Sequence, residues 1–284
     1  MESATQPILC CLGDCVAGLP TQFLMERALG PAGVDWRVLT VEVEPERFDD
    51  ALTGMLAMRF QAARFFPLLD SVAARSPQIQ SPMAEFVGSV SSVILDGDHY
   101  QGWHHAGPVV MAQINQLSAK SNSPENSIAI WLFGNTPFVR SVVAALEYSN
   151  LSGCLWLGDY TKALPIPIAD TQLRNLTTAE EAIAAWSALA EAIPIGSLAL
   201  ISDEVSDIQI SPNALESIPG DLHFYIRKPV SKQLVSELGW PSHARVCAGA
   251  DLQVLFEAYD FQRWTGRAVD PAQLRDALDE FSDF

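Results

Sequence analysis

Short apolar runs alternate with amphipathic stretches in the first third of the chain. The apolar runs predict buried strands at Ile8–Leu12, Arg37–Val43, Ala62–Phe66 and Val90–Leu95. Apolar residues three and four positions apart predict helices over Thr21–Leu29 and Phe48–Met58, with Glu44-Pro45-Glu46 as the start signal of the second. Asp96-Gly97-Asp98 predicts a tight turn, so Val90–Leu95 and His99–Trp103 are expected to form a hairpin.

The pattern changes after Ser118–Asn126, a polar segment that is the best linker candidate in the chain. Continuous apolar strands and helices now alternate: strands at Ser127–Phe133, Gly153–Leu157, Leu198–Ile201 and Leu222–Ile226, and helices at Pro137–Tyr148 and Thr178–Ala192. This alternation is typical of a parallel sheet covered on both faces. Leu252–Trp264 and Pro271–Phe281 predict two closing helices.

Together these patterns predict an α/β protein with two domains. We expect an N-terminal α/β domain over residues 1–108, a doubly wound parallel sheet over 109–245, and C-terminal helices over 246–284. A chain of 284 residues is long enough for this plan. In such proteins, ligands sit between domains and at the carboxyl ends of strands.

Charge and apolar content exclude several classes of partner. The chain has 17 Lys and Arg against 34 Asp and Glu, so its net charge is −17. A surface this acidic repels phosphate backbones and anionic lipids, so we expect neither nucleic acid nor a membrane surface as a partner. No apolar run approaches the roughly 20 residues that a membrane-spanning helix needs.

Cysteine usage favours a reducing compartment. The five cysteines are Cys10, Cys11, Cys15, Cys154 and Cys247, an odd number spread through apolar runs. Reduced thiols fit this pattern better than disulfides, and the opening residues carry no secretory signal, so we expect a cytoplasmic protein. The first three cysteines lie on or just after a predicted strand and are expected to be core thiols.

Gly134-Asn135-Thr136-Pro137 follows a strand and opens a helix, where a dinucleotide-binding loop would lie. A full fingerprint needs three glycines, and only Gly134 is present, so an ordinary strand-to-helix turn is the competing interpretation. Asp159 ends the next strand and could accept hydrogen bonds from a ribose diol, which favours NAD over NADP if either binds. A solvated turn residue is the alternative.

A histidine group is the remaining candidate for chemistry. His99, His104 and His105 lie near Asp96 and Asp98 and could hold a metal ion. Adjacent histidines on a strand point to opposite faces, so His104 and His105 are not expected to share one ion. We therefore expect no metal site, and a hairpin with polar edges instead.

The order of these segments resembles the shikimate dehydrogenase family along nearly the whole chain. The hairpin, with Val90-Ser91-Ser92-Val93-Ile94, Asp96-Gly97 and Gly102-Trp103-His104-His105-Ala106-Gly107, is similar to the family's Val-Asn-Thr-Val-Val, Asp-Gly, Gly-Tyr-Asn-Thr-Asp-Gly. Leu252 to Phe261-Gln262-Arg263-Trp264-Thr265-Gly266 resembles its closing helix, and Gly13–Leu29 its opening substrate loop and helix. The resemblance implies a substrate domain, a Rossmann-like NADP domain and C-terminal helices that return to the first domain.

The resemblance also shows where this chain departs from the family. Leu69 and Ala106 stand at the positions of the proton-transferring Lys and Asp, so no catalytic pair is expected. The implied substrate-pocket positions are Thr21, Ser91, His104, His105 and Phe256, and the implied cofactor positions are Gly134, Asn135, Thr136, Asp159 and Gly249. At these positions an acid replaces the family's phosphate-reading Arg, and Phe256 replaces its Gln.

These departures leave three hypotheses. The first is a catalytically inactive protein that uses another small molecule or a protein partner, with no bound cofactor. The second is an active NAD(P)-dependent oxidoreductase with an altered substrate, in which His104 or His105 replaces the lost acid–base group. The third is a true shikimate dehydrogenase with a different catalytic solution. The sequence favours the first, and a homodimer is compatible with all three.

Overall fold

The structure is a computed structural model that describes residues 6–120, 127–146, 153–157, 173–176, 195–208 and 221–282, together with 184, 210 and 212–216. The chain divides into two compact units. Unit 1 joins Met1–His105 to Gln253–Phe284, and unit 2 comprises Ala106–Leu252. Unit 1 is therefore built from two segments that are far apart in the sequence.

Unit 1 contains a six-stranded mixed sheet in the order β2-β1-β3-β5-β6-β4. Strands β3 and β5, and β5 and β6, pair antiparallel, and the other neighbours are parallel. The strands are β1 (Ile8–Gly13), β2 (Arg37–Glu42), β3 (Ala62–Phe65), β4 (Ile79–Gln80), β5 (Ser92–Asp96) and β6 (His99–Trp103).

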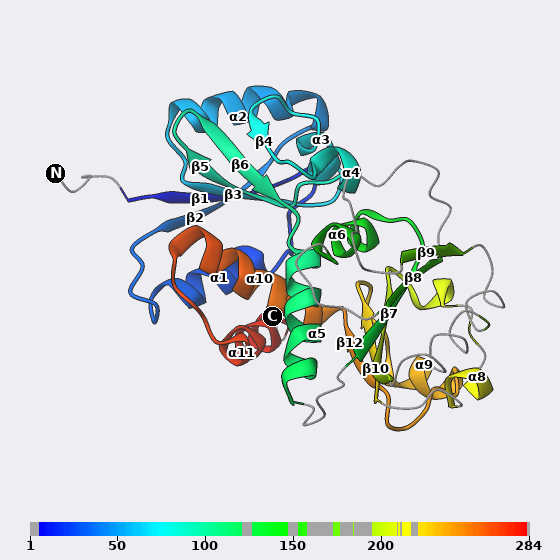
Figure 1. The fold of residues 1–284 in the computed structure, drawn as a ribbon. Coiled ribbons are helices and arrows are strands. Elements are labelled where there is room, and N and C mark those ends of the chain that lie inside the picture. Colours follow the sequence, from blue (N-terminus) through cyan, green and yellow to red (C-terminus); the bar gives the residue numbers. More distant parts are fainter. Residues whose placement is uncertain are drawn as a thin grey trace. The chain divides into compact units, whose positions relative to one another are not determined.

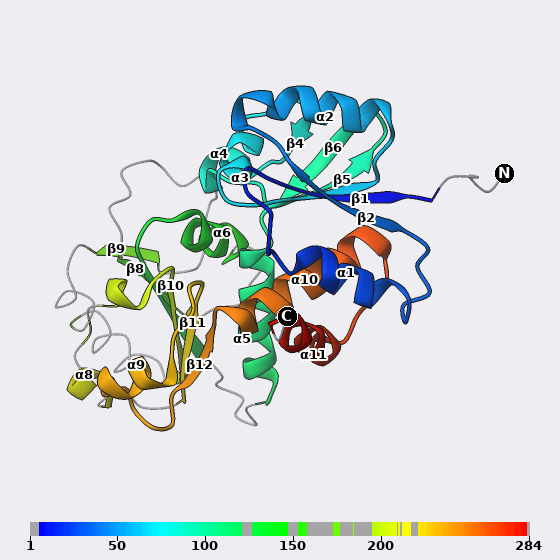
Figure 2. The ribbon, with the colours of Figure 1, turned by 180° about the vertical axis from the view of Figure 1, so that it is seen from behind.

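Helices cover both faces of this sheet (Figure 1; Figure 2). Helix α2 (Phe48–Ala57) covers one face, and α1 (Thr21–Leu29), α10 (Ala250–Thr265) and α11 (Pro271–Ser282) cover the other. Successive side chains of β1 point to opposite faces of the sheet, so the core has two layers. Cys10 and Leu12 pack on the α2 side, and Leu9 and Cys11 pack on the α1 side. The shorter helical elements are η1 (Pro45–Arg47), α3 (Leu69–Ala73) and α4 (Ala84–Val87).

Unit 2 contains a six-stranded parallel sheet in the order β12-β11-β10-β7-β8-β9. The strands are β7 (Ser127–Phe133), β8 (Gly153–Leu157), β9 (Leu173–Leu176), β10 (Ile195–Ser202), β11 (Asp221–Ile226) and β12 (Arg245–Ala248). This is the strand order of a doubly wound dinucleotide-binding sheet, with the reversal between β7 and β10.

The described helical elements of unit 2 are α5 (Ala106–Lys120), α6 (Pro137–Ala145), η3 (Val205–Asp207), α8 (Pro212–Glu216) and α9 (Lys232–Glu237). Helices α5 and α6 cross very closely, because a Cβ on Gly107 would lie 2.1 Å from the carbonyl oxygen of Ser141. Gly107 also donates its N–H to Ser141 Oγ at 2.8 Å. Glycine is therefore required at this crossing.

The structure confirms the predicted α/β class, with a Rossmann-like second sheet. Helix Thr21–Leu29 and strands His99–Trp103, Ser127–Phe133 and Gly153–Leu157 have the predicted bounds. The hairpin strand predicted from Val90 begins at Ser92, because Val90 and Ser91 precede the ladder.

Four expectations need correction or fall outside the description. Residues 118–120 of the expected linker belong to α5, a helix that was not predicted because Gly107-Pro108 looks like a break. The helix predicted to Tyr148 is described only to Ala145, and Thr178–Ala192 lies outside the described residues except for residue 184. Cys15 is exposed and not a core thiol, because β1 ends at Gly13.

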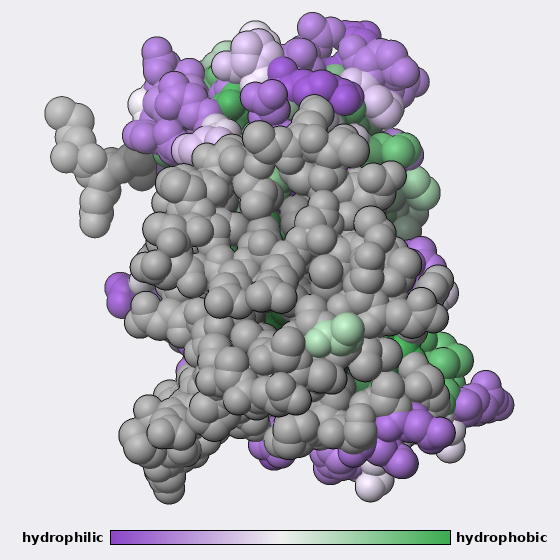
Figure 3. Space-filling view, turned by 45° about the vertical axis from the view of Figure 1, so that its right-hand side comes forward, coloured by the Kyte–Doolittle hydropathy of each residue, from purple (hydrophilic) through white to green (hydrophobic). Residues whose placement is uncertain are grey.

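Hydrophilic side chains cover the top of the described surface, over α2 (Figure 3). In the part of the chain that the structure describes, no helix is long and apolar enough to cross a membrane. Among the described cysteines, Cys10, Cys11, Cys15 and Cys247 form no disulfide.

Candidate functional site

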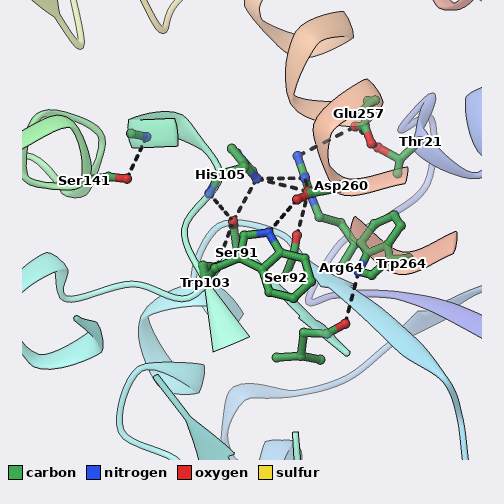
Figure 4. A network of polar contacts seen from close by, with 12 residues as sticks. Thr21, Arg64, Ser91, Ser92, Trp103, His105, Ser141, Glu257, Asp260 and Trp264 are labelled. Atoms are coloured by element: carbon green, nitrogen blue, oxygen red, sulfur yellow. Dashed lines mark hydrogen bonds and ion pairs between the residues drawn. The ribbon is translucent and has the colours of Figure 1, made fainter. Parts of the chain in front are cut away.

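A buried arginine is the centre of a polar cluster in unit 1 (Figure 4). Arg64 lies in the middle of β3, and its side chain is on the face covered by α10. It forms ion pairs with Asp260 and, at 3.7 Å, with Glu257, and neither carboxylate side chain is more than 1% exposed. Both acids come from α10, where a spacing of three residues places them on one helix face.

Asp260 receives hydrogen bonds from several elements. Ser92 Oγ donates to Oδ2 at 2.6 Å, Trp103 Nε1 donates to Oδ1 at 2.7 Å, and Arg64 donates to Oδ2. Burial alone would raise the pKa of Asp260, but Arg64, His105 and these donors outweigh it and lower the pKa to about 2. Asp260 is therefore ionised at neutral pH and links β3, β5 and β6 to α10.

Glu257 is less completely paired. Its Oε1 accepts a hydrogen bond from Thr21 Oγ1 at 2.9 Å, while Oε2 is buried with no hydrogen-bond partner among the described residues. Burial raises the pKa of Glu257, against the opposing effect of the Arg64 charge. The charge of Arg64 is thus balanced by two buried carboxylates, of which Asp260 is the more fully hydrogen-bonded.

His105 completes the cluster. Its Nδ1 lies 2.8 Å from Ser91 Oγ, 2.9 Å from Arg64 Nη1 and 3.2 Å from Asp260 Oδ2. Because Arg64 can only donate, Nδ1 carries the lone pair and the proton is on Nε2. Burial and then the Arg64 charge lower the pKa of His105 to about 4, so the ring is neutral at pH 7.

This arrangement does not form a hydrolytic triad. A triad needs the serine and the aspartate on opposite ring nitrogens, so that one nitrogen takes the serine proton while the aspartate orients the ring and stabilises its charge through the other. Here Ser91 and Asp260 both lie against Nδ1, and Ser91 is 3% exposed. The cluster is instead a network in which the polar groups bond mainly to one another, with Glu257 Oε2 left without a hydrogen-bond partner among the described residues.

Four of the five predicted pocket residues meet in this network. Thr21 contacts Glu257, Ser91 contacts His105, and the ring of Phe256 stacks on His105 at 4.4 Å. His104 is only partly buried, with its ring 5.3 Å from that of His105. Strand β6 ends at Trp103, so the premise that His104 and His105 share a strand was wrong.

Leu69 and Ala106, the positions of the missing catalytic pair, have no exposed surface. Leu69 opens α3 and packs in the core on the α2 side of the sheet, apart from the Arg64 network. His99 lies on β6 beside Asp96 and Asp98. Among the described residues, no group of three or more His, Cys, Asp or Glu is arranged to hold a metal ion.

The predicted cofactor loop lies at the reversal point of the unit 2 sheet, after β7. Gly134 has a φ of 84°, which favours glycine. Thr136 is the N-cap of α6 and accepts the N–H of Val139, while Pro137 at the first helical position offers no N–H. Asn135 is held by Arg140, whose Nη1 donates to its carbonyl oxygen at 2.8 Å.

Acidic residues follow the neighbouring strand β10. An Asp207 carboxylate oxygen lies 3.8 Å from where a Cβ of Gly134 would be, and Asp203 and Glu204 pair with Arg227 and Lys228. Gly249, after β12, has a φ of 51° and packs against Pro229. Asp159 lies outside the described residues.

Sequence reasoning missed Arg64, Glu257 and Asp260, which organise the whole network. Two signals were present in the sequence. A single charged residue interrupts the apolar strand Ala62–Phe65, and two acids lie three residues apart among the apolar residues of α10. Buried charges are rarely left unpaired, so an isolated charge in an apolar strand should prompt a search for its partner.

Comparison with solved structures identifies the fold, whereas the two sequence comparisons find no match. No protein-family model matches the sequence, and no curated protein matches it. Solved structures do: shikimate 5-dehydrogenase from Listeria monocytogenes, in complex with shikimate and NAD, has a TM-score of 0.70 at 13% identity and covers 97% of each chain. The Thermus thermophilus enzyme in complex with shikimate has a TM-score of 0.62 at 17% identity, covering 98% of this chain and 100% of that one.

A shikimate 5-dehydrogenase-like protein also matches over the full length of both chains, with a TM-score of 0.66 at 12% identity. This chain therefore has the shikimate dehydrogenase fold. Identities this low establish the fold and leave substrate and activity to be argued from the site itself.

Proposed function

We propose that this chain is a non-catalytic protein built on the shikimate dehydrogenase fold, which acts through another ligand or a protein partner. The observation that carries the proposal is the Arg64–Asp260–His105 network. It engages four of the five pocket residues that the family resemblance implies, and protein groups already bond to Thr21 Oγ1, Ser91 Oγ and His105 Nδ1.

A polar substrate would find few free partners there. Thr21 Oγ1 already donates to Glu257, and Ser91 Oγ accepts from the N–H of His105 at 3.1 Å. Each buried hydroxyl of a substrate left unpaired costs about 1–3 kcal/mol. An anionic substrate would also meet the carboxylates of Glu257 and Asp260. These features argue against a hydroxylated acid such as shikimate as the ligand.

We further propose that no nicotinamide cofactor binds, and that NAD is favoured over NADP if one does. The start of α6 offers a phosphate little, because Thr136 already accepts the N–H of Val139 and Pro137 has none. The carboxylate of Asp207 beside Gly134 repels a pyrophosphate at the same place.

Free thiols agree with a cytoplasmic location.

Absorbance of the reduced cofactor tests the proposal. The protein at high concentration, with shikimate or quinate and either NAD or NADP, is expected to show no turnover above background. Listeria monocytogenes shikimate 5-dehydrogenase, assayed in parallel, is the positive control. Turnover near about 10 per second, the ordinary enzyme median, would overturn the proposal.

A His104→Gln variant separates the two ways in which activity could appear. If the wild type turns over and this variant does not, the partly exposed His104 has replaced the lost acid–base group, as the second hypothesis holds. Calorimetry with NADP is an independent check. A dissociation constant below about 100 μM, roughly 5.5 kcal/mol of binding free energy, contradicts the cofactor proposal.

A further inference from the structure

Strand β2 is an unprotected edge of the unit 1 sheet. It pairs with β1 alone, and its register with β1 is continuous from Arg37 to Glu42, with no bulge. Natural edge strands are commonly kept short or protected by proline, bulges or central charges. The opposite edge, β4, has only two residues. In β2 the charges stand only at the two ends, and no proline interrupts it.

The outward backbone groups of β2 follow from its pairing. Arg37 donates its N–H to Pro7 and Val43 donates to Gly13, so residues 37, 39, 41 and 43 face β1. Val38, Thr40 and Glu42 therefore direct their N–H and C=O groups away from the sheet. Among the described residues no backbone or side-chain group bonds to these outward groups.

Two apolar side chains accompany this edge. Leu39 and Val41 lie on one face of β2, beside Cys10 and Leu12 of β1, and each is 40% exposed. They are two of the few large apolar side chains with this much exposure among the described residues. A free edge with an apolar row is a template for another strand.

We propose that β2 pairs antiparallel with β2 of a second copy of this chain, about a two-fold axis at Thr40. This register opposes Val38 to Glu42 and Thr40 to itself as hydrogen-bonded pairs, which gives about six backbone hydrogen bonds. It opposes Leu39 to Val41 in the closer, non-hydrogen-bonded pairs, so the exposed apolar residues of both copies cover each other.

We assign the partner strand to a second copy of this chain because, in this register, β2 of one copy matches β2 of the other residue by residue. All three outward-facing residues find partners, and both exposed aliphatic residues lose their exposure. Pairing between two six-residue strands is a small interface, so the dimer is weak and depends on concentration. The net charge of −17 on each copy opposes association, and added salt therefore strengthens it.

Sedimentation velocity from low micromolar to near-millimolar protein tests the dimer. Thr40→Pro removes one outward N–H without touching the β1 ladder, a change that edge strands tolerate. It is expected to weaken the dimer about tenfold or more, since several hydrogen bonds and their register are lost. Thr40→Ala, which keeps the N–H and loses only the bond to Gln22, is the matched control.

Val41→Lys is a second variant, at an exposed position where folding is not at risk, and it is also expected to weaken the dimer. The register has its own test. Thr40→Cys places two thiols opposite each other, with a Cα separation of about 5.5 Å that suits a disulfide, whereas Arg37→Cys does not. Both variants share the exposed native Cys15, so only the difference in cross-linking counts.

A wild-type protein that stays monomeric at every concentration and salt level overturns the proposal. So does a dimer that Thr40→Pro and Val41→Lys leave unchanged, because the interface then lies elsewhere. Equal cross-linking of the Thr40→Cys and Arg37→Cys variants overturns the register.

Discussion

At the scale of single residues, Arg64 decides the character of unit 1. A buried cation is tolerated only where charged and hydrogen-bonded partners surround it, and Glu257 and Asp260 together supply that compensation. Trp103 and Ser92 in turn donate hydrogen bonds that hold Asp260 in place. Removing one member therefore leaves the others buried and unsatisfied, which costs more than the loss of one contact.

Asp260→Asn tests this dependence. The variant leaves Arg64 without one of its two counter-charges and without its ion-paired hydrogen bond, so the free energy of unfolding is expected to fall by about 3–5 kcal/mol, measured by urea denaturation. Asp98→Asn is the matched control, because that carboxylate is fully exposed, and it should leave stability unchanged. The double variant Arg64→Met/Asp260→Leu should cost less than Asp260→Asn alone. A larger loss in the double variant would contradict this account.

The neutral state of buried His105 predicts a pH dependence. Its folded pKa is about 4, below the ordinary 6.5, so the unfolded chain binds more protons between these values. Stability is therefore present above about pH 6.5 and is lost as the pH falls toward 4, by at most about 1.4 kcal/mol per pH unit. Asp260, with its pKa lowered to about 2, extends the loss below pH 4.

Urea denaturation at pH 7, 6 and 5 measures this slope. The slope should be smaller in His105→Gln, which keeps a polar side chain but has no titrating ring. An equal slope in the variant and the wild type would mean that another group is responsible.

At the scale of elements, the close packing of α5 against α6 in unit 2 depends on the glycine at residue 107. The contact between α5 and α6 leaves no room for a side chain at residue 107, where even a methyl group would overlap Ser141 backbone atoms. The same Gly107-Pro108 pair hides α5 from pattern reading, although proline is accepted in the first turn of a helix.

Gly107→Ala is expected to destabilise the protein by about 1–3 kcal/mol or more, because the helices must move apart. Gly54→Ala, in α2, is the matched control, since its added methyl group meets only the flexible end of Met58 at 3.9 Å. That control should be neutral or stabilising by up to about 1 kcal/mol. Thermal unfolding of both variants measures the difference, and equal melting temperatures would contradict the packing argument.

The sequence alone predicted those helices and strands that have regularly spaced apolar residues and clear breaks on either side. Helix α1 and strand β7 are recognised from their apolar spacing and flanking breaks, and their bounds are correct. Only part of the candidate site could be predicted from the sequence. Thr21, Ser91, His105 and Phe256 came from family resemblance, whereas Arg64 finds its partners almost 200 residues later, at Glu257 and Asp260. A pairing at that separation leaves no local period to detect.

At the scale of the whole molecule, unit 1 is discontinuous in sequence. Its sheet comes from the first 105 residues, while α10 and α11 come from the last segment, Gln253–Phe284. The aromatic residues Phe261 and Trp264 of α10 pack in the same core as β1 and α1, and Trp264 Nε1 donates to Val93 O at 3.1 Å.

Truncation after Leu252 should therefore unfold unit 1, because it removes both carboxylates of Arg64 and much of one core layer. Hydrogen exchange at the β1 and β3 amides is expected to lose its protection. Truncation after Ser282, which removes two residues, is the control and should leave these amides protected. Retained protection in the shorter chain would show that the sheet and α1 suffice.

The discontinuity of unit 1 also sets an order of events during synthesis. The ribosome completes β1 to β6 first and then makes all of unit 2 before α10 emerges. At about 5–20 residues per second, this interval lasts roughly 7–30 seconds. Throughout that time Arg64 has no counter-charge from α10, and the apolar side chains beneath α10 remain uncovered. The nascent unit 1 therefore stays incomplete for longer than the first domain of a protein with two consecutive domains, which has its whole sequence as soon as it leaves the ribosome.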